Sequence, residues 1–275
     1  MATFRELVKD LGKRAAVRIG GGLSRLFGCC AGGTVGILTY HRVAPSAGGA
    51  DAPTWNVPPR QFRSQLEGVL RGGYRPCTLQ KVLEAGRAGR PLPLRTFVVT
   101  FDDGYESVHR FAWPVLRRLG VPATVFLATA YLDSGARFPF DDWRGAGAEG
   151  VLPEAWRPLS TSQCNEMLQD GLVELGSHTH THADFRGRPD SLLEDLRTSA
   201  AVLEERFGVR KPTFAFAYGI AGPELSDAAR RAGVACALST QPVLVRPQSD
   251  PFTWGRFTVS EGDTAETIAP KLDGW

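Results

Sequence analysis

The sequence has few cysteines, no long apolar run and little excess of charge. Among its 275 residues the five cysteines are odd in number, form no C-x-x-C pair and stand at positions 29, 30, 77, 164 and 236. They therefore predict reduced or buried thiols, not a disulfide framework. No stretch of about 18 uninterrupted apolar residues occurs, so no membrane-spanning helix is predicted. Lys and Arg total 32 against 29 for Asp and Glu. This balance lacks the concentrated basic patch of nucleic-acid-binding proteins, so we expect no nucleic-acid partner.

Residues 1–27 form a basic segment with apolar residues at roughly helical spacing. The pattern predicts a basic amphipathic helix, which would either pack on its own domain or make peripheral contact with an anionic membrane. A secretory signal needs a continuous apolar stretch, and Gly20–Gly22 and Arg25 interrupt the one candidate. We expect a cytoplasmic protein, with membrane association and secretion left open as alternatives. Residues 1–33, which end in a glycine-rich joint, are thus expected to precede a separate domain.

Beyond residue 33, short apolar runs typical of strands alternate with segments of helical periodicity. The expected strands are 34–41, 96–101, 123–128, 172–176, 213–217 and 235–238. The expected helices are 58–70, 107–119, 162–170, 191–207 and 223–232. This alternation predicts a single α/β domain over residues 34–275, with about seven parallel strands arranged as a barrel. Residues 133–158 lack periodicity and predict a long functional loop.

Two adjacent carboxylates, Asp102 and Asp103, follow the expected strand 96–101. Active sites of parallel α/β folds form at the carboxyl ends of strands. Adjacent side chains at such an end point in different directions, so one carboxylate can bind a cation while the other accepts a proton. A divalent ion would also relieve their mutual repulsion. The structural alternative is an N-cap of the following helix.

Three histidines, His178, His180 and His182, follow the expected strand 172–176. The i, i+4 spacing predicts that His178 and His182 lie on one side of a helical turn, as zinc ligands require, while His180 points away. Three histidines within five residues at a strand end are not readily explained by packing alone. One carboxylate and two histidines form a familiar set for a catalytic divalent ion with open positions for water and substrate.

The segments TFDDG at 100–104 and SHTHTH at 177–182 resemble the first two motifs of the polysaccharide deacetylases, the NodB-homology group of carbohydrate esterase family 4. Further segments match in order: ILTYHRV at 37–43, VPPRQFRSQLEGVLRGGYRP at 57–76, VPATVFLAT at 121–129 and GLVELGSHT at 171–179. The resemblance implies a distorted (β/α) barrel with fewer than eight strands. It also implies a metal-dependent hydrolase that removes N-acetyl groups from N-acetylhexosamine units of a saccharide, polysaccharide or glycolipid.

The resemblance also assigns roles to individual residues. Asp103, His178 and His182 would hold a divalent metal, foremost Zn²⁺, although the donor set also suits Co²⁺, Ni²⁺ or Fe²⁺. No residue is assigned to an organic cofactor. Asp102 would be the general base that takes a proton from the attacking water.

The third motif of the family, R-x-P-Y, stands here as Ala215-Phe216-Ala217-Tyr218. Tyr218 is retained, and the resemblance implies that its backbone N–H stabilises the oxyanion. The arginine that steadies the base is absent from the motif. We therefore expect Arg256 to supply it, with a surface ion pair as the alternative.

The general acid is a second departure from the family pattern. Many members supply it from a late L-x-H motif, but no histidine follows His182 in this sequence. His41 ends the first expected strand, at the same barrel face as the other motifs, and some members use such an early histidine. We therefore expect His41 to protonate the leaving amine, and we expect His109 to be a surface residue.

Two other functions compete with sugar de-N-acetylation. One is an amidase acting on a non-sugar C–N bond, because the same site would serve any amide that fits. The other is a carbohydrate-binding member with impaired catalysis, suggested by the altered third motif. Aromatic residues of the long loop favour a sugar substrate, because aromatic faces stack on pyranose rings; they are Phe138, Phe140, Trp143 and Trp156. Retention of Asp102, which the metal does not need, favours catalysis.

Overall fold

A computed structural model describes residues 33–46, 55–141 and 151–274, so the expected helix of residues 1–27 lies outside the described residues. Within these ranges one sheet contains eight strands, and every pairing between them is parallel. The strands are β1 (Val35–Tyr40), β2 (Arg75–Pro76), β3 (Thr96–Phe101), β4 (Ala123–Leu127), β5 (Val173–Ser177), β6 (Phe214–Ala215), β7 (Ala237–Leu238) and β8 (Phe257–Thr258). Seven follow the order β7-β6-β5-β4-β3-β1-β8, and β2 pairs with β3.

The two ends of this sheet are joined by the segment 251–258. The Ala237 N–H donates to the Pro251 carbonyl at 3.0 Å, and the Ser239 N–H donates to the Trp254 carbonyl at 2.9 Å. A few residues later β8 pairs with β1. The same short segment therefore contacts both β7 and β1, which confirms the expected distorted barrel of about seven parallel strands in one domain.

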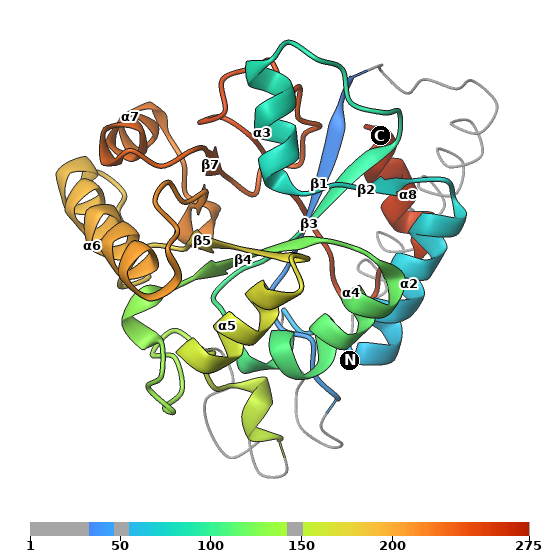
Figure 1. Cartoon of the computed structure of the whole chain (residues 1–275), viewed down its shortest axis with the longest axis horizontal. Helices are drawn as coiled ribbons and strands as arrows, with labels where there is room; N and C mark the ends of the chain where they lie inside the picture. The colour runs from blue at the N-terminus through green and yellow to red at the C-terminus, as the bar shows by residue number, and fades with distance from the viewer. Residues whose placement is uncertain (1–32, 47–54, 142–150, 275) are drawn as a thin grey trace, which may run out of the picture.

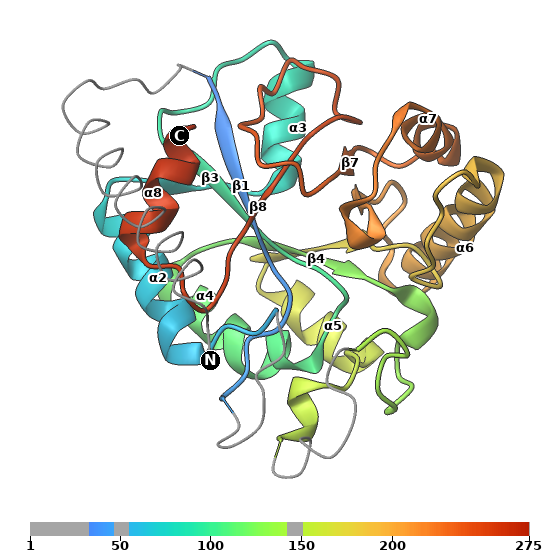
Figure 2. The same cartoon turned by 180° about the vertical axis from the view of Figure 1, so that it is seen from behind.

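Helices surround the sheet on its outer side. They are α2 (Pro59–Arg71), α3 (Leu79–Arg87), α4 (Trp113–Leu119), α5 (Thr161–Gln169), α6 (Pro189–Phe207), α7 (Pro223–Ala232) and α8 (Ala265–Asp273). Figure 1 shows α2 and α8 side by side on one flank and α6 and α7 on the other, and the reverse view in Figure 2 shows the same pairs. No helix in the described ranges is long and apolar enough to cross a membrane.

Local sequence explains where these helices begin and which face they bury. Helix α2 starts with Pro59, whose missing N–H costs nothing in the first turn, and it buries Phe62, Leu66 and Val69 at helical spacing. Helix α5 begins with a capping box in which Ser160 and Gln163 satisfy each other's backbone N–H groups. The residues between the strand ends and these helices include the turns that form the site.

The central strands are buried on both faces, as expected when helices cover a parallel sheet. Every residue of β1, β3 and β4 is buried, and these strands are rich in Val, Phe and Leu. The surrounding strands and helices hold the backbones of β1 and β3 in place. The positions of the residues that directly follow these two strands are therefore fixed as well.

Several elements were not expected from the sequence. Helix α3 is one of them, although its sequence does carry a helix signal. Thr78 caps its start, and Leu79, Val82 and Leu83 line its buried face. Strand β8 has only two residues and therefore no periodicity to detect. In the expected loop 133–158, the described parts hold only a short 3₁₀ turn, Pro153–Ala155, in agreement with the expected lack of regular structure.

The close packing of β5 against β4 gives a test of the fold. A Cβ atom on Gly176 would lie 2.6 Å from the Phe126 ring and 2.8 Å from the Thr213 carbonyl oxygen. Gly176→Ala should therefore lower the free energy of unfolding by about 1–3 kcal/mol, the usual cost of overpacking. Urea denaturation measures this change. Gly262→Ala is the matched control, because its new Cβ would meet only one atom, at 3.9 Å. Equal stability of the two variants would contradict the packing described here.

Candidate metal centre

The turn after β3 separates two neighbouring carboxylates. The Asp102 N–H still pairs with the Tyr40 carbonyl of β1 at 2.9 Å, which holds Asp102 on the strand. Asp103 and Gly104 then adopt φ of 71° and 84°. This left-handed pair turns the chain sharply. The two adjacent side chains consequently reach different partners.

The histidine segment after β5 is a loop and not the helical turn that the i, i+4 spacing suggested. Thr179 and His182 have positive φ, 70° and 55°, which a helical turn does not allow. The Ser177 hydroxyl oxygen accepts the Thr179 N–H at 3.1 Å, and the Thr179 hydroxyl oxygen accepts the His182 N–H at 2.8 Å. These side-chain hydrogen bonds bring His178 and His182 together by a different backbone route.

Asp195, in the second turn of α6, supports the middle of this loop. Its carboxylate accepts the His180 N–H at 2.5 Å, the Thr181 N–H at 3.2 Å and the Thr181 hydroxyl at 2.6 Å. The His180 ring lies against the Thr129 hydroxyl at 3.0 Å, away from the other two histidines, as expected. Sequence reasoning missed Asp195, because an acidic residue near a helix start carries no specific signal.

Asp103, His178 and His182 converge at one point. The Asp103 Oδ1 atom lies 3.3 Å from His178 Nε2 and 3.2 Å from His182 Nε2. All three side chains are buried, and their ligand atoms lie within 4.8 Å of one another. Ligands at about 2.0–2.1 Å from a tetrahedral ion lie about 3.3 Å apart. The donor spacing therefore fits a zinc-type ion.

The hydrogen bonds and charges of these residues suit a cation. His178 Nδ1 lies 2.8 Å from the Ala215 carbonyl, which fixes the ring with Nε2 toward Asp103. Burial acts to raise the pKa of Asp103, but hydrogen bonds from both imidazoles outweigh it and hold the pKa well below its usual range. Asp103 is therefore in the ionised form that a metal requires.

Arg256 makes a buried bidentate ion pair with Asp102. Its Nη1 and Nη2 atoms lie 2.6 and 2.7 Å from the two carboxylate oxygens, and its side chain is 0% exposed. Further contacts reach the hydroxyls of Thr39 and Thr100 and the carbonyl of Ser239. Burial alone would raise the pKa of Asp102, but the charge of Arg256 outweighs it and lowers the pKa. The alternative of a surface ion pair does not hold for Arg256.

His41 lies at the end of β1, beside Asp102. Its Nε2 atom is 4.0 Å from Asp102 Oδ2, and its side chain is 17% exposed. Burial lowers the pKa of His41, while Asp103 and Asp102 act in the opposite direction. His109 is elsewhere, paired with Glu166 on α5 at 2.9 Å. The structure thus brings His41 to the candidate centre and leaves His109 out of it.

Tyr218 follows β6 in a left-handed turn, with φ 58° and ψ 9°. Its ring meets His182 edge to face at 4.7 Å, and the residue is 56% exposed. Four of the six non-glycine residues with positive φ in the described ranges belong to this centre: Asp103, Thr179, His182 and Tyr218. Such residues cost about 1–3 kcal/mol each and concentrate at functional sites.

Phe140 holds His182 by a ring contact. The two rings stack at 3.6 Å with an interplanar angle of 19°, and Tyr218 touches the same imidazole. His182 Nδ1 is buried and has no hydrogen-bond partner among the described residues. A metal-binding histidine usually donates its second ring N–H to an acceptor, which fixes the ring. Here the stacked Phe140 ring takes over that orienting role.

The aromatic residues of the loop 133–158, which were expected to favour sugar binding, do not share one environment. Phe138 is buried against Tyr105 and Tyr131, so its ring is not open to a substrate. Trp156 lies under the Arg137 guanidinium, and Trp143 falls outside the described residues. Phe138 therefore supports the structure, and Phe140 contacts the centre itself.

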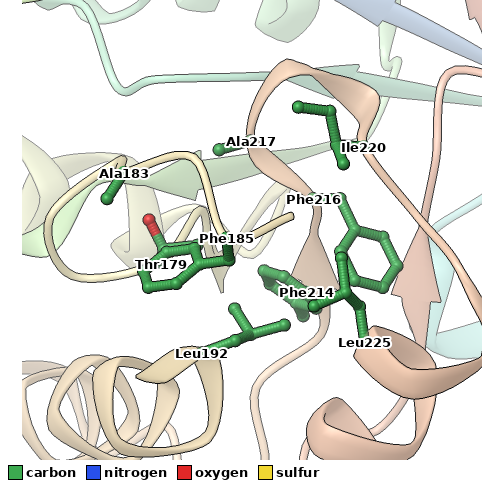
Figure 3. Close-up of a pocket in the computed structure, with 9 residues that line it drawn as sticks. All are labelled: Thr179, Ala183, Phe185, Leu192, Phe214, Phe216, Ala217, Ile220 and Leu225. Atoms are coloured by element: carbon green, nitrogen blue, oxygen red, sulfur yellow. The ribbon is translucent and has the colours of Figure 1, made fainter. Parts of the chain in front are cut away.

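A small apolar pocket, with a cavity volume of about 10 Å³, backs the histidine loop. Figure 3 shows side chains from β6, α6 and α7 gathered around it, with Thr179 and Ala183 on the loop side. Its other lining residues are Phe185, Leu192, Phe214, Phe216, Ala217, Ile220 and Leu225. None of these side chains can exchange a proton, so the pocket supports the loop and carries none of the chemistry.

Comparison with known proteins agrees with this geometry. The family model for polysaccharide deacetylase matches residues 89–237, which contain both metal-site motifs. The poly-beta-1,6-N-acetyl-D-glucosamine N-deacetylase of Staphylococcus epidermidis is 25% identical over 257 residues, covering 86% of this chain and 83% of that protein.

Solved structures show the same fold. IcaB from Ammonifex degensii is similar with a TM-score of 0.72 and 28% identity, covering 88% of this chain and 98% of that chain. The deacetylase PplD of Streptococcus pyogenes gives a TM-score of 0.73 at 18% identity, covering 88% and 99%. The second likeness shows the shared fold alone.

The stacking of Phe140 on His182 predicts a specific loss of metal affinity. Phe140→Ala removes the contact that orients the ring, so zinc affinity should fall by about 10-fold or more, as when an outer partner of a metal ligand is lost. Competition with a chromophoric chelator measures this affinity without any assay of activity. Phe207→Ala, at the opposite end of α6 from the histidine loop, is the control and should keep the wild-type affinity. If Phe140→Ala bound zinc as tightly, the orienting role would be refuted.

Proposed function

The chain belongs to the polysaccharide deacetylase family and removes N-acetyl groups from saccharide units, and on that premise we propose that its substrate is a polymer of N-acetylglucosamine. The support for this substrate is the likeness to the poly-beta-1,6-N-acetyl-D-glucosamine N-deacetylase of Staphylococcus epidermidis, which extends over most of both chains. The observation that carries the catalytic proposal is the separation of roles between the adjacent carboxylates: Asp103 faces two histidines, and Asp102 faces Arg256.

We further propose that Asp103, His178 and His182 hold Zn²⁺. The support is the donor set, one carboxylate and two imidazoles, with the spacing that tetrahedral zinc requires. When bound, such an ion supplies Lewis-acid polarisation of the acetyl carbonyl and makes water in the site more acidic. The orphaned Nδ1 of His182 does not conflict with this assignment, because its Nε2 is the atom that faces Asp103.

The chain's own residues then move the protons. Asp102 is kept ionised by Arg256, so it is in the basic form that can take a proton from the attacking water. The bidentate contact also fixes the plane of the carboxylate, which keeps the base oriented. His41, whose Nε2 lies 4.0 Å from Asp102 Oδ2, would give a proton to the amine that leaves.

Tyr218 completes the proposed machinery. The proposal gives its backbone N–H the role of donor to the oxyanion that forms on the acetyl carbonyl. Support comes from the left-handed turn at Tyr218 and from its ring contact with His182. A backbone donor does not depend on the side chains at positions 215 and 217, so the alanines there are compatible with catalysis.

The altered third motif does not favour an impaired carbohydrate-binding protein. Arg256 contacts Asp102 from the segment that joins β7 to β1, so the base has an arginine although position 215 is alanine. A binding protein without catalysis would have no use for a buried, charge-paired carboxylate beside the metal ligands, because an unneeded buried ion pair is costly to desolvate.

Acetate release separates the roles of the two carboxylates. Asp102→Asn should leave zinc content nearly unchanged and lower kcat by about 10² or more, the range for a lost general base. Asp103→Asn should weaken zinc binding directly, because a charged ligand is lost. The assay uses poly-β-1,6-N-acetylglucosamine oligomers before chelation, after chelation and after zinc is returned. Equal loss of zinc in both variants would show that the division of roles is wrong.

His41→Ala tests the proposed acid. Turnover should fall by about 10²–10⁴ with zinc retained, because the amine must then leave without a positioned proton donor. His109→Ala, a histidine outside the centre, should keep wild-type turnover. Steady-state kinetics with zinc analysis of each protein gives both readings. Normal kcat in His41→Ala would remove this residue from the mechanism.

A further inference from the structure

We propose that the indole of Trp55 is a binding subsite on which a sugar ring of the saccharide stacks, next to the unit that is deacetylated. The inference rests on the proposed function for the class of ligand, a chain of neutral N-acetylhexosamine units. It goes beyond that function by assigning a subsite and the residue that forms it. Trp55 lies outside residues 89–237, which the family model matches.

The first support is the exposure of Trp55 at the candidate centre. Its side chain is 48% exposed, although it is large and apolar. One part of the indole stacks on the His41 ring, with centroids 5.1 Å apart and an interplanar angle of 24°. The exposed part therefore lies beside the proposed acid, where substrate must pass. An exposed aromatic surface at such a place is a typical binding surface.

The second support is the rigid mounting of this exposed side chain. The Trp55 carbonyl accepts the Arg42 N–H at 3.2 Å, and the Val57 N–H donates to the Arg42 carbonyl at 3.0 Å. Between them, the Asn56 side chain pairs with both the N–H and the carbonyl of Ala44, each at 3.0 Å. These four bonds form a short parallel pairing between residues 42–44 and 55–57, just beyond the end of β1. These bonds fix the backbone at Trp55, and the stack on His41 orients the indole before substrate arrives, which limits the entropy lost on binding.

The mounting itself is buried and charge-paired. Arg42 is 1% exposed, and its guanidinium contacts Asp141 at 2.8 Å, the Ala155 carbonyl and the face of Tyr105. The backbone that carries Trp55 is therefore tied to the loop that also positions Phe140. A fixed backbone with an exposed aromatic side chain is what a stacking platform requires.

The exposed indole of Trp55 is a neutral aromatic surface, which suits a sugar ring as ligand. A pyranose ring presents C–H groups on its faces, and these pack on an aromatic face without needing a charged partner. His41 must reach the nitrogen of the reacting unit, so the indole stacked against His41 lies toward the neighbouring unit. The subsite should therefore matter for oligomers and not for a single sugar.

The test compares kcat and KM for Trp55→Ala, Trp55→Phe and wild type on N-acetylglucosamine and on its β-1,6-linked tetramer and hexamer. We expect Trp55→Ala to raise KM for the oligomers about tenfold with much less effect on kcat, because uniform binding is lost. Trp55→Phe should restore most of the affinity, since it keeps an aromatic face. Leu94→Ala is the matched control, because Leu94 is 61% exposed and precedes β3, at the end of the strand remote from Asp102.

Two results would overturn the proposal. Unchanged KM for the hexamer in Trp55→Ala would show that no sugar stacks there. Equal loss of kcat on the monomer and the hexamer would show that Trp55 only positions His41. A separate calorimetric titration of the hexamer into Asp102→Asn, with and without Trp55→Ala, measures binding without turnover. If wild type released no acetate from any oligomer, the proposed function would fail, and this titration would still show whether Trp55 binds a saccharide.

Discussion

Two ionised carboxylates on adjacent residues, both buried, impose the main physical constraint on this fold. Burying Asp102 and Asp103 without separate cations would cost several kcal/mol for each charge. The turn with left-handed φ at Asp103 sends the two side chains to different partners. Asp102 receives the guanidinium of Arg256, and Asp103 receives two imidazoles that can share a metal ion. In the proposed mechanism, the same division of charge separates proton transfer from metal binding.

The arginine comes from the segment of the chain that joins the two ends of the sheet. The segment 251–258 pairs with β7 at one end and with β1 at the other, and Arg256 lies between these two contacts. The segment that closes the barrel therefore places the positive charge of Arg256 beside Asp102, the residue that directly follows β3. This arrangement explains how position 215 can be alanine. The Ala215 backbone carbonyl still fixes the His178 ring. The positive charge that the family's arginine would supply at position 215 comes instead from Arg256.

The fold and the convergence of Asp103, His178 and His182 could be predicted because their signals are local. Buried parallel strands read as short apolar runs, and the polar residues that follow β3 and β5 stand directly at their ends. The contact of Arg256 with Asp102 could be predicted only indirectly, from the absence of an arginine at position 215. The helical turn expected for His178 and His182 was wrong, because side-chain hydrogen bonds from Ser177 and Thr179 stabilise a loop with the same spacing. Contacts between residues far apart in the sequence produce no local pattern. The contacts of Asp195 with the histidine loop and of Phe140 with His182 were missed for that reason.

The most direct test of this account is anomalous diffraction at the zinc edge from crystals of the protein grown with Zn²⁺. We predict one strong peak bonded to Asp103, His178 Nε2 and His182 Nε2, with the bidentate contact between Arg256 and Asp102 intact. A peak bonded to Asp102, or an Arg256 side chain turned away from Asp102 when zinc is present, would contradict the division of charge on which the mechanism depends.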